Sequence, residues 1–176
     1  MELQAALEQR YSCRCFTDQA PTIEQLTALV EAGRLAPTAC NNQSQRVYVV
    51  TGAENLDKLD NCTKCRYGAQ AAFVIGFDTI EAAVHDPERM GGTTFSFGDQ
   101  DAISVLVHMA LKATDLGLAT CWLGAINDNQ LHLEFGIPET VAIRAVLVCG
   151  HPDPEKGGPA GMHTKRRPAE ETITWL

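Results

Sequence analysis

The spacing of apolar and polar residues along the chain alternates between a helical period and the two-residue period of strands. Local chemistry marks one helix start, because Thr22 and Gln25 fit a capping box directly after Pro21. The same helix should end before Pro37. In chain order, the pattern predicts helices over 1–10 and from 22 to before 37, a strand over 47–51, a short helix around 56–59, a strand over 71–77, a helix over 101–116, a strand over 118–123, a short helix from 127 and a strand over 141–149.

The connections between these elements are irregular in length. Residues 78–99 carry several glycines and the pair Asp86-Pro87, which favour a loop, and we expect this stretch to be mobile or to cover a site. A helical turn over 81–84 is the alternative. Irregular spacing favours an α+β architecture over a regular doubly wound fold, with one domain over residues 1–176.

The helix predicted over 101–116 is apolar on most of its circumference. Its polar residues Ser104, His108, Lys112 and Asp115 recur every three or four positions and form one narrow stripe. A helix of this kind is buried on most sides. Part of it could therefore face a second subunit, and a central helix of a monomer is the alternative. We interpret His108 as a packing residue rather than a catalytic one.

Composition narrows the possible functions. The chain has a net charge of −8, which disfavours a nucleic-acid partner, since such partners are bound mainly by neutralising phosphates. No run approaches the roughly 18 to 20 apolar residues of a membrane helix, and the acidic start does not resemble a signal peptide. We therefore expect a cytoplasmic protein. Positive charge gathers at Lys64 and Arg66 and again at 165–167, and each island is a candidate anion site or a solvated basic patch.

The motifs of several enzyme classes are missing. The sequence has no dinucleotide fingerprint, no phosphate loop of the Walker type and no Gly-x-Ser-x-Gly elbow. The seven cysteines are odd in number, and we do not expect a disulfide framework. The pair Cys62-x-x-Cys65 is interpreted first as two ordinary thiols. A redox or substrate-side role and half of a zinc site are the alternatives, although no further ligand pair completes a metal site.

The segments 10–16, 36–45 and 116–124 together resemble the FMN-dependent nitroreductase family. Arg-Tyr-Ser-Cys-Arg-Cys-Phe at 10–16 is similar to the family's Arg-x-Ser-x-Arg/Lys-x-Phe. Ala-Pro-Thr-Ala-Cys-Asn-Asn-Gln at 36–43 is similar to Ala-Pro-Ser-x-x-Asn-x-Gln, although Ser44 and Gln45 replace the Pro-Trp that follows in the family. Leu-Gly-Leu-Ala-Thr-Cys-Trp-Leu-Gly at 116–124 is close to Leu-Gly-Leu-Gly-Thr-Cys-Trp-x-Gly, and the basic tail at 165–171 is a weaker match.

The resemblance implies a mixed, mostly antiparallel sheet flanked by helices, and a homodimer with a long buried interface helix. It also implies bound FMN. Arg10 and Ser12 would meet the phosphate and ribityl end, Arg14 the ring edge, and the loop at 37–43 would come from the partner subunit or the shared interface. The cofactor-binding candidates are Arg10, Tyr11, Ser12, Arg14, Pro37, Thr38, Ala39, Asn41, Gln43, Cys121, Trp122, Leu123, Gly124, Lys165, Arg166 and Arg167.

The same resemblance implies a ping-pong oxidoreductase in which NADH or NADPH and a small acceptor, such as a nitroaromatic or a quinone, use the flavin in turn. No catalytic side chain and no metal are then required. Cys40, Cys65, Arg66 and Tyr67 are candidates for the substrate side. The tail 160–176, which ends in Ile173, Trp175 and Leu176, is expected to pack on the partner subunit. The alternatives are a flavoprotein of this fold with another reductive task, such as dehalogenation, and a thiol or metal-binding module around Cys62 and Cys65.

Overall fold

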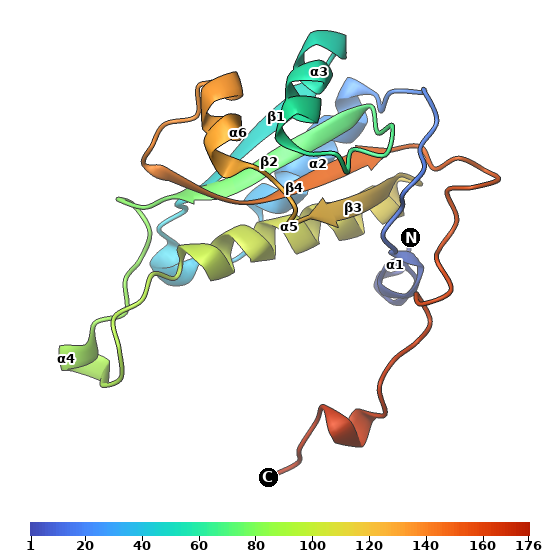
Figure 1. The fold of residues 1–176 in the computed structure, drawn as a ribbon. Helices are drawn as coiled ribbons and strands as arrows, with labels where there is room; N and C mark the ends of the chain where they lie inside the picture. The colour runs from blue at the N-terminus through green and yellow to red at the C-terminus, as the bar shows by residue number, and fades with distance from the viewer.

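An antiparallel sheet of four strands forms the centre of the protein, as the computed structural model of residues 1–176 shows (Figure 1). The strands are β1 (Gln45–Thr51), β2 (Ala71–Asp78), β3 (Ala119–Leu123) and β4 (Val141–Gly150), and their order in the sheet is β1-β2-β4-β3. All three strand pairs are antiparallel. The one parallel contact is an isolated bridge between Ser12 and Thr120, beside the edge strand β3.

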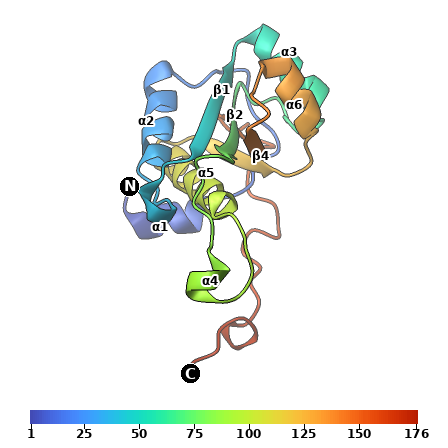
Figure 2. The same cartoon turned by 90° about the vertical axis from the view of Figure 1, so that its left-hand side faces the viewer.

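Helices cover both faces of the sheet (Figure 2). On one face lie α2 (Ile23–Arg34) and α5 (Gly98–Asp115), and on the other lie α3 (Ala53–Cys62) and α6 (Asp128–Phe135). Strand β2 is buried from Ala71 to Phe77 because successive side chains point to opposite faces, and each face has its own apolar cover. The sequence predicted an α+β fold, and the antiparallel sheet with helices on both faces confirms it.

Most predicted elements are confirmed within a few residues. The capping box is formed, with the Gln25 N–H donating to Thr22 Oγ1 at 3.2 Å and the Thr22 N–H donating to Gln25 Oε1 at 2.9 Å. Helix α2 ends at Arg34, before Pro37. Helix α1 (Leu3–Gln9) occupies the amphipathic start of the chain.

The segment 79–97 is mostly loop, as the sequence predicted, but it lacks the helical turn that was the alternative. No helix forms over 81–84; instead Val84 pairs with Ser96, and the short helix α4 (Pro87–Met90) lies at the tip. The segment extends away from the sheet as an arm (Figure 1). Its outgoing and returning chain segments are in contact through a His85–Phe95 stack with ring centroids 4.7 Å apart. Two backbone hydrogen bonds cross the arm, from the His85 N–H to the Phe95 carbonyl at 2.8 Å and from the Phe97 N–H to the Ala83 carbonyl at 2.9 Å. Its mobility stays a prediction.

Helix α5 buries one face against the sheet and α2, and leaves the other face partly uncovered. Ala102, Val105 and Met109 are fully buried, whereas Val107 is 42% exposed. Helix α1 packs near the C-terminal end of α5, where the Met1 amino group pairs with Asp115 at 2.6 Å. The prediction of burial on most sides is thus only partly met within one chain, because apolar residues of the outer face have no cover. None of the helices is both long and apolar enough to cross a bilayer.

The two cysteines of the pair Cys62-x-x-Cys65 differ in exposure, since Cys62 is buried and Cys65 is half-buried. Cys62 ends helix α3, where it is buried and its thiol donates to the Lys58 carbonyl at 3.4 Å. Burial, assisted by the charge of Glu134, raises the pKa of Cys62 to about 11. A redox thiol needs the opposite shift, so the position of Cys62 favours the interpretation as an ordinary packing residue. No three side chains of His, Cys, Asp or Glu converge on a point where a metal ion could sit.

The glycine at position 76 is required by a close backbone approach. A Cβ at this position would lie 2.5 Å from the Ala142 carbonyl oxygen, at the irregularity in the β2–β4 pairing. We expect Gly76→Ala to lower the free energy of unfolding by about 1–3 kcal/mol, because the two central strands must separate. Gly161→Ala, where nothing lies within 4 Å, is the matched control and should be neutral. Urea denaturation of both variants tests this, and equal stabilities would show that the strands yield without cost.

The buried thiols should be inert at moderate pH. Burial raises the pKa of Cys149 to about 12, and the pKa of Cys62 is about 11, so both remain protonated at pH 8. Cys40 is exposed. We expect a thiol reagent at pH 8 to label Cys40 rapidly and to label Cys62 and Cys149 only after unfolding, as measured by mass spectrometry of peptides. Labelling of Cys149 in the folded protein at the rate of Cys40 would contradict this assignment.

Candidate functional site

The segment 10–16 runs along the edge of the sheet and presents alternate side chains to the outside. Cys13 is fully buried, its N–H donates to the Thr120 carbonyl at 2.9 Å, and its thiol donates to the carbonyls of Cys15 and Gly157. Since neighbouring residues of an extended segment face opposite ways, Ser12 and Arg14 point outward. The bridge to strand β3 thus fixes the direction in which the first motif presents its polar side chains.

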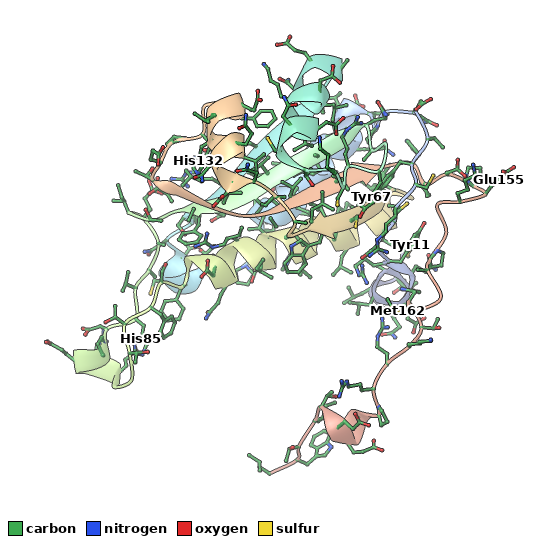
Figure 3. All side chains as sticks on the ribbon, in the orientation of Figure 1. Tyr11, Tyr67, His85, His132, Glu155 and Met162 are labelled. Atoms are coloured by element: carbon green, nitrogen blue, oxygen red, sulfur yellow. The ribbon has the colours of Figure 1, made fainter.

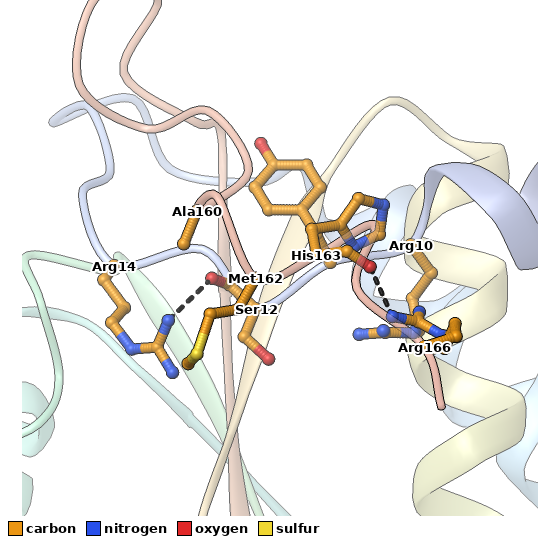
Figure 4. A pocket seen from close by; sticks show the side chains of 8 residues that line it. Arg10, Ser12, Arg14, Ala160, Met162, His163 and Arg166 are labelled. Carbon is orange, nitrogen blue, oxygen red and sulfur yellow. Dashed lines mark hydrogen bonds between the residues drawn. The ribbon is translucent and has the colours of Figure 1, made fainter. Parts of the chain in front are cut away.

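A cavity of about 220 Å³ opens in front of this motif (Figure 4). Its lining combines the motif with the chain segment after β4, so residues about 150 positions apart in sequence face one another. The lining residues are Arg10, Tyr11, Ser12, Arg14, Ala160, Met162, His163 and Arg166.

The cavity is positively charged. No carboxylate lines it, and none of the guanidinium groups of Arg10, Arg14 and Arg166 takes part in an ion pair. Arg14 donates only to the Ser12 carbonyl, at 3.4 Å, and Arg166 donates to backbone carbonyls of the tail. Three cations without counter-charges in a chain of net charge −8 make this the place where an anion is best stabilised.

An apolar hollow of about 390 Å³ adjoins the charged cavity. The two share Arg10 and Ser12, so a ligand can place an anionic end in one and a flat apolar body in the other. Trp122 borders the hollow from strand β3 and is 48% exposed. The remaining lining residues are Leu7, Leu106, Val107, Ala110, Leu111, Thr120 and Leu147.

The other candidates of the third motif take different positions. Cys121 and Leu123 point into the core, and burial raises the pKa of the Cys121 thiol. Gly124 is exposed just beyond strand β3. Of this motif, only Trp122 and Thr120 present side chains to the hollow, so any contribution of Cys121 or Leu123 to a ligand would come from the backbone.

Two of the substrate-side candidates lie beside the first motif. The neighbouring Cys65 thiol is the largest cause that raises the pKa of the Tyr67 hydroxyl, while the Arg14 guanidinium near the same hydroxyl lowers it. Figure 3 shows Tyr67 and Tyr11 on the same side of the sheet. Tyr67 also has a positive φ of 56°, an uncommon backbone conformation that fixes the direction of this loop.

Arg66 does not join this group. Its guanidinium makes two hydrogen bonds with Asp60, at 2.7 and 2.6 Å, and a third with the Ala69 carbonyl at 2.9 Å. Lys64 donates to the Asp60 carbonyl. The first basic island of the sequence is therefore used internally, and the structure leaves Arg66 no free donor pair for an anion.

The loop at 37–43 lies at the other end of helix α5. The Ala39 N–H donates to Asp101 near the start of this helix, whereas the first motif follows α1, which packs near its end at Asp115. Asp101 and Asp115 are 115 − 101 = 14 residues apart on α5, which corresponds to about 21 Å at 1.5 Å per residue. Within one chain, the candidates Pro37, Thr38, Ala39, Cys40, Asn41 and Gln43 line neither the cavity nor the hollow.

The basic tail contributes one residue to the cavity. Arg166 lines it, whereas Arg167 pairs with Glu171 at 3.4 Å, and Lys165 is exposed outside the lining. Met162 and His163 line the cavity but were not singled out by sequence. His163 contacts the Glu8 carbonyl through Nε2 at 3.0 Å, and its place two residues before the basic run is the signal that could have found it.

Known proteins share this sequence pattern. The family model described as "Nitroreductase family" matches residues 7–67 and 64–151 of the chain. A protein of Archaeoglobus fulgidus, provisionally named an NADH dehydrogenase/NAD(P)H nitroreductase, is 27% identical over 154 residues, which cover 84% of this chain and 83% of that protein.

Solved structures share the fold. A nitroreductase family protein of Clostridium difficile 630 is similar with a TM-score of 0.88 and 28% identity, covering 99% of this chain and 98% of that one. A provisionally named nitroreductase of Desulfovibrio desulfuricans, solved in complex with FMN, is similar with a TM-score of 0.78 and 25% identity over 100% of this chain and 97% of that one. The family model matches most of this chain, residues 7–151. The chain therefore belongs to the nitroreductase family.

Proposed function

We propose that the protein is an FMN-dependent oxidoreductase that passes electrons from NADH or NADPH, through bound FMN, to a small acceptor such as a nitroaromatic or a quinone. The observation that carries the proposal is the charged cavity around Arg10, Arg14 and Arg166, which opens into an apolar hollow beside Trp122. The names of the relatives, NAD(P)H nitroreductase and a nitroreductase in complex with FMN, support it.

The chain's residues fit FMN by their chemistry. A phosphate dianion suits the unpaired guanidinium groups of Arg10 and Arg166, and the Ser12 hydroxyl can donate to the same end of the ligand. Arg14 lines the charged cavity and not the hollow, so it could donate to oxygens at the edge of the ring that faces the cavity. Bound FMN would supply hydride and electron transfer, while the protein supplies position and charge. No side-chain acid or base is needed, and none stands in the hollow.

We further propose that the working protein is a homodimer. Within one chain the loop at 37–43 lines neither the cavity nor the hollow, so a ligand held there would meet no residue of this loop. A second copy related by a two-fold axis perpendicular to α5 would place the two α5 helices antiparallel and bring the loop of one chain toward the cavity of the other. The outer face of α5, with Val107 42% exposed, and the projecting tail, with Trp175 93% exposed, supply apolar surface for that contact.

Donor and acceptor would use the same place in turn. Both would have to stack on the same exposed face of the flavin ring beside Trp122, so the reduced nicotinamide would leave before the acceptor enters. That shared place favours ping-pong kinetics. The arm at 79–97 lies at the same end of α5 as the loop, where the Asn42 side chain donates to the Glu81 carbonyl at 2.9 Å, so in a dimer both would approach the partner's cavity together.

Loss of one arginine should weaken FMN binding. We expect Arg14→Ala to raise the FMN dissociation constant about 10- to 100-fold, since a hydrogen bond to a charged group commonly contributes about 1.5–3 kcal/mol. Arg34→Ala, which removes an exposed arginine of α2 paired with Glu31, is the matched control and should bind as the wild type does. Quenching of flavin fluorescence measures both constants, and unchanged binding by Arg14→Ala would remove Arg14 from the site.

Steady-state kinetics should show alternating substrates. With NADH or NADPH varied at several fixed concentrations of a quinone, we expect parallel lines in a double-reciprocal plot, because one hollow accepts both ligands. An excess of either substrate should inhibit by occupying the wrong form. Lines that intersect would mean that donor and acceptor are bound at the same time, in separate places.

A further inference from the structure

Asp101 is a buried carboxylate that no cation neutralises. Its side chain belongs to the first turn of α5, the residue is 4% exposed, and it takes part in no ion pair. Burying such a charge is unfavourable unless donors surround it. Two donors meet it, both from the preceding loop: the Ala39 N–H reaches Oδ1 at 2.9 Å, and the Ser44 hydroxyl reaches Oδ2 at 3.4 Å.

The loop between these two donors is strained. Cys40, Asn41 and Gln43 have φ values of 55°, 55° and 53°, in the left-handed region that favours glycine. Such conformations persist when the surrounding structure fixes them, and they gather at ligand-binding segments. Here a single carboxylate fixes both ends of the strained stretch, and within it the Gln43 N–H donates to Thr38 Oγ1 at 3.1 Å.

We propose that Asp101 is a positioning residue that holds the loop at 38–44 in the shape required to contact FMN in the charged cavity of the partner copy. The inference rests on the proposed function and adds to it the residue that shapes the second half of the site. Asp101 does not reach the ligand itself, because its two oxygens are directed at Ala39 and Ser44.

The side chain's chemistry distinguishes three substitutions. An ionised carboxylate accepts at both oxygens, which matches two donors aimed at it. An Asn side chain keeps one oxygen that accepts from the Ala39 N–H. Its NH₂ group can donate a hydrogen bond to the Ser44 hydroxyl oxygen. Ala removes both acceptor oxygens, so the Ala39 N–H and the Ser44 hydroxyl lose their hydrogen bonds. The strained residues between them are then no longer held in place. The expected order of loop retention is therefore Asp, then Asn, then Ala.

FMN affinity of the full-length apoprotein is the first readout. We expect Asp101→Ala to raise the FMN dissociation constant about tenfold or more, and Asp101→Asn to stay within about threefold of the wild type. Asp99→Ala is the matched control, because Asp99 lies on the same turn, is exposed and pairs with Arg144. If Asp101→Ala does not fold, Ser44→Ala, which removes one of the two donors, carries the same test with a smaller expected loss.

A mixed dimer separates this role from a general structural one. A dimer of one Arg14→Ala chain and one Asp101→Ala chain, isolated with two affinity tags, would hold one unaltered site, built from the cavity of the second chain and the loop of the first. We expect it to bind one FMN with wild-type affinity, although neither altered homodimer does. If loop and cavity acted within one chain, both sites would carry a defect and no tight site would remain.

The outcomes are distinct. Wild-type affinity in Asp101→Ala, or a mixed dimer without a tight site, would overturn the role of Asp101 while leaving FMN binding by the wild type intact. Failure of the wild-type protein to bind FMN would contradict the proposed function itself. Tight binding by the mixed dimer, with Asp101→Asn close to the wild type, would establish the positioning role.

Discussion

Ala102, Val105 and Met109 pack helix α5 along one face of the sheet, and this packing determines where the candidate site residues lie. The start of the helix holds the loop at 38–44 through Asp101, and the end of the helix packs against α1, from which the Arg10–Arg14 segment continues. A straight helix of 18 residues cannot bring its two ends together. Each chain therefore holds the loop apart from the cavity and the hollow, and the proposed dimer would bring the loop of one copy to the cavity of the other.

Charge adds a second constraint. The chain is acidic overall, yet Arg10, Arg14 and Arg166 converge on a cavity from which carboxylates are absent. Several other arginines are neutralised within the fold, as Arg66 is by Asp60 and Arg46 by Asp78 and Glu81. The contrast identifies the guanidinium groups that are available to a ligand, because a cation already paired has little left to offer an anion.

Local patterns in the sequence were sufficient for much of the fold. The capping box at Thr22 and the apolar run of β2 depend on neighbouring residues, and both were predicted. The arm at 79–97 was not, since its pairing of Val84 with Ser96 spans a turn that no period reveals. The family resemblance gathered the site residues into one group, but it could not show that those of the loop lie at the far end of α5 from Arg14.

Other parts of the site depend on tertiary contacts that carry no motif. Met162 and His163 reach the cavity because the chain after β4 folds back on α1, where His163 contacts the Glu8 carbonyl. Asp101 reads in the sequence as an ordinary acidic residue of a first helical turn, and its role emerges only from the two donors that the loop directs at it. The sequence gives no sign that Arg66 is paired. Only the fold shows that its guanidinium group donates to Asp60.

In the proposed dimer, two copies of the chain together build an FMN site. Size-exclusion chromatography with light scattering and absorbance at flavin wavelengths measures particle mass and bound flavin in the same peak. We predict a yellow particle of twice the 19.1 kDa chain mass that releases about one FMN per chain. A colourless particle after incubation with FMN, or a monomer that retains the flavin, would contradict it.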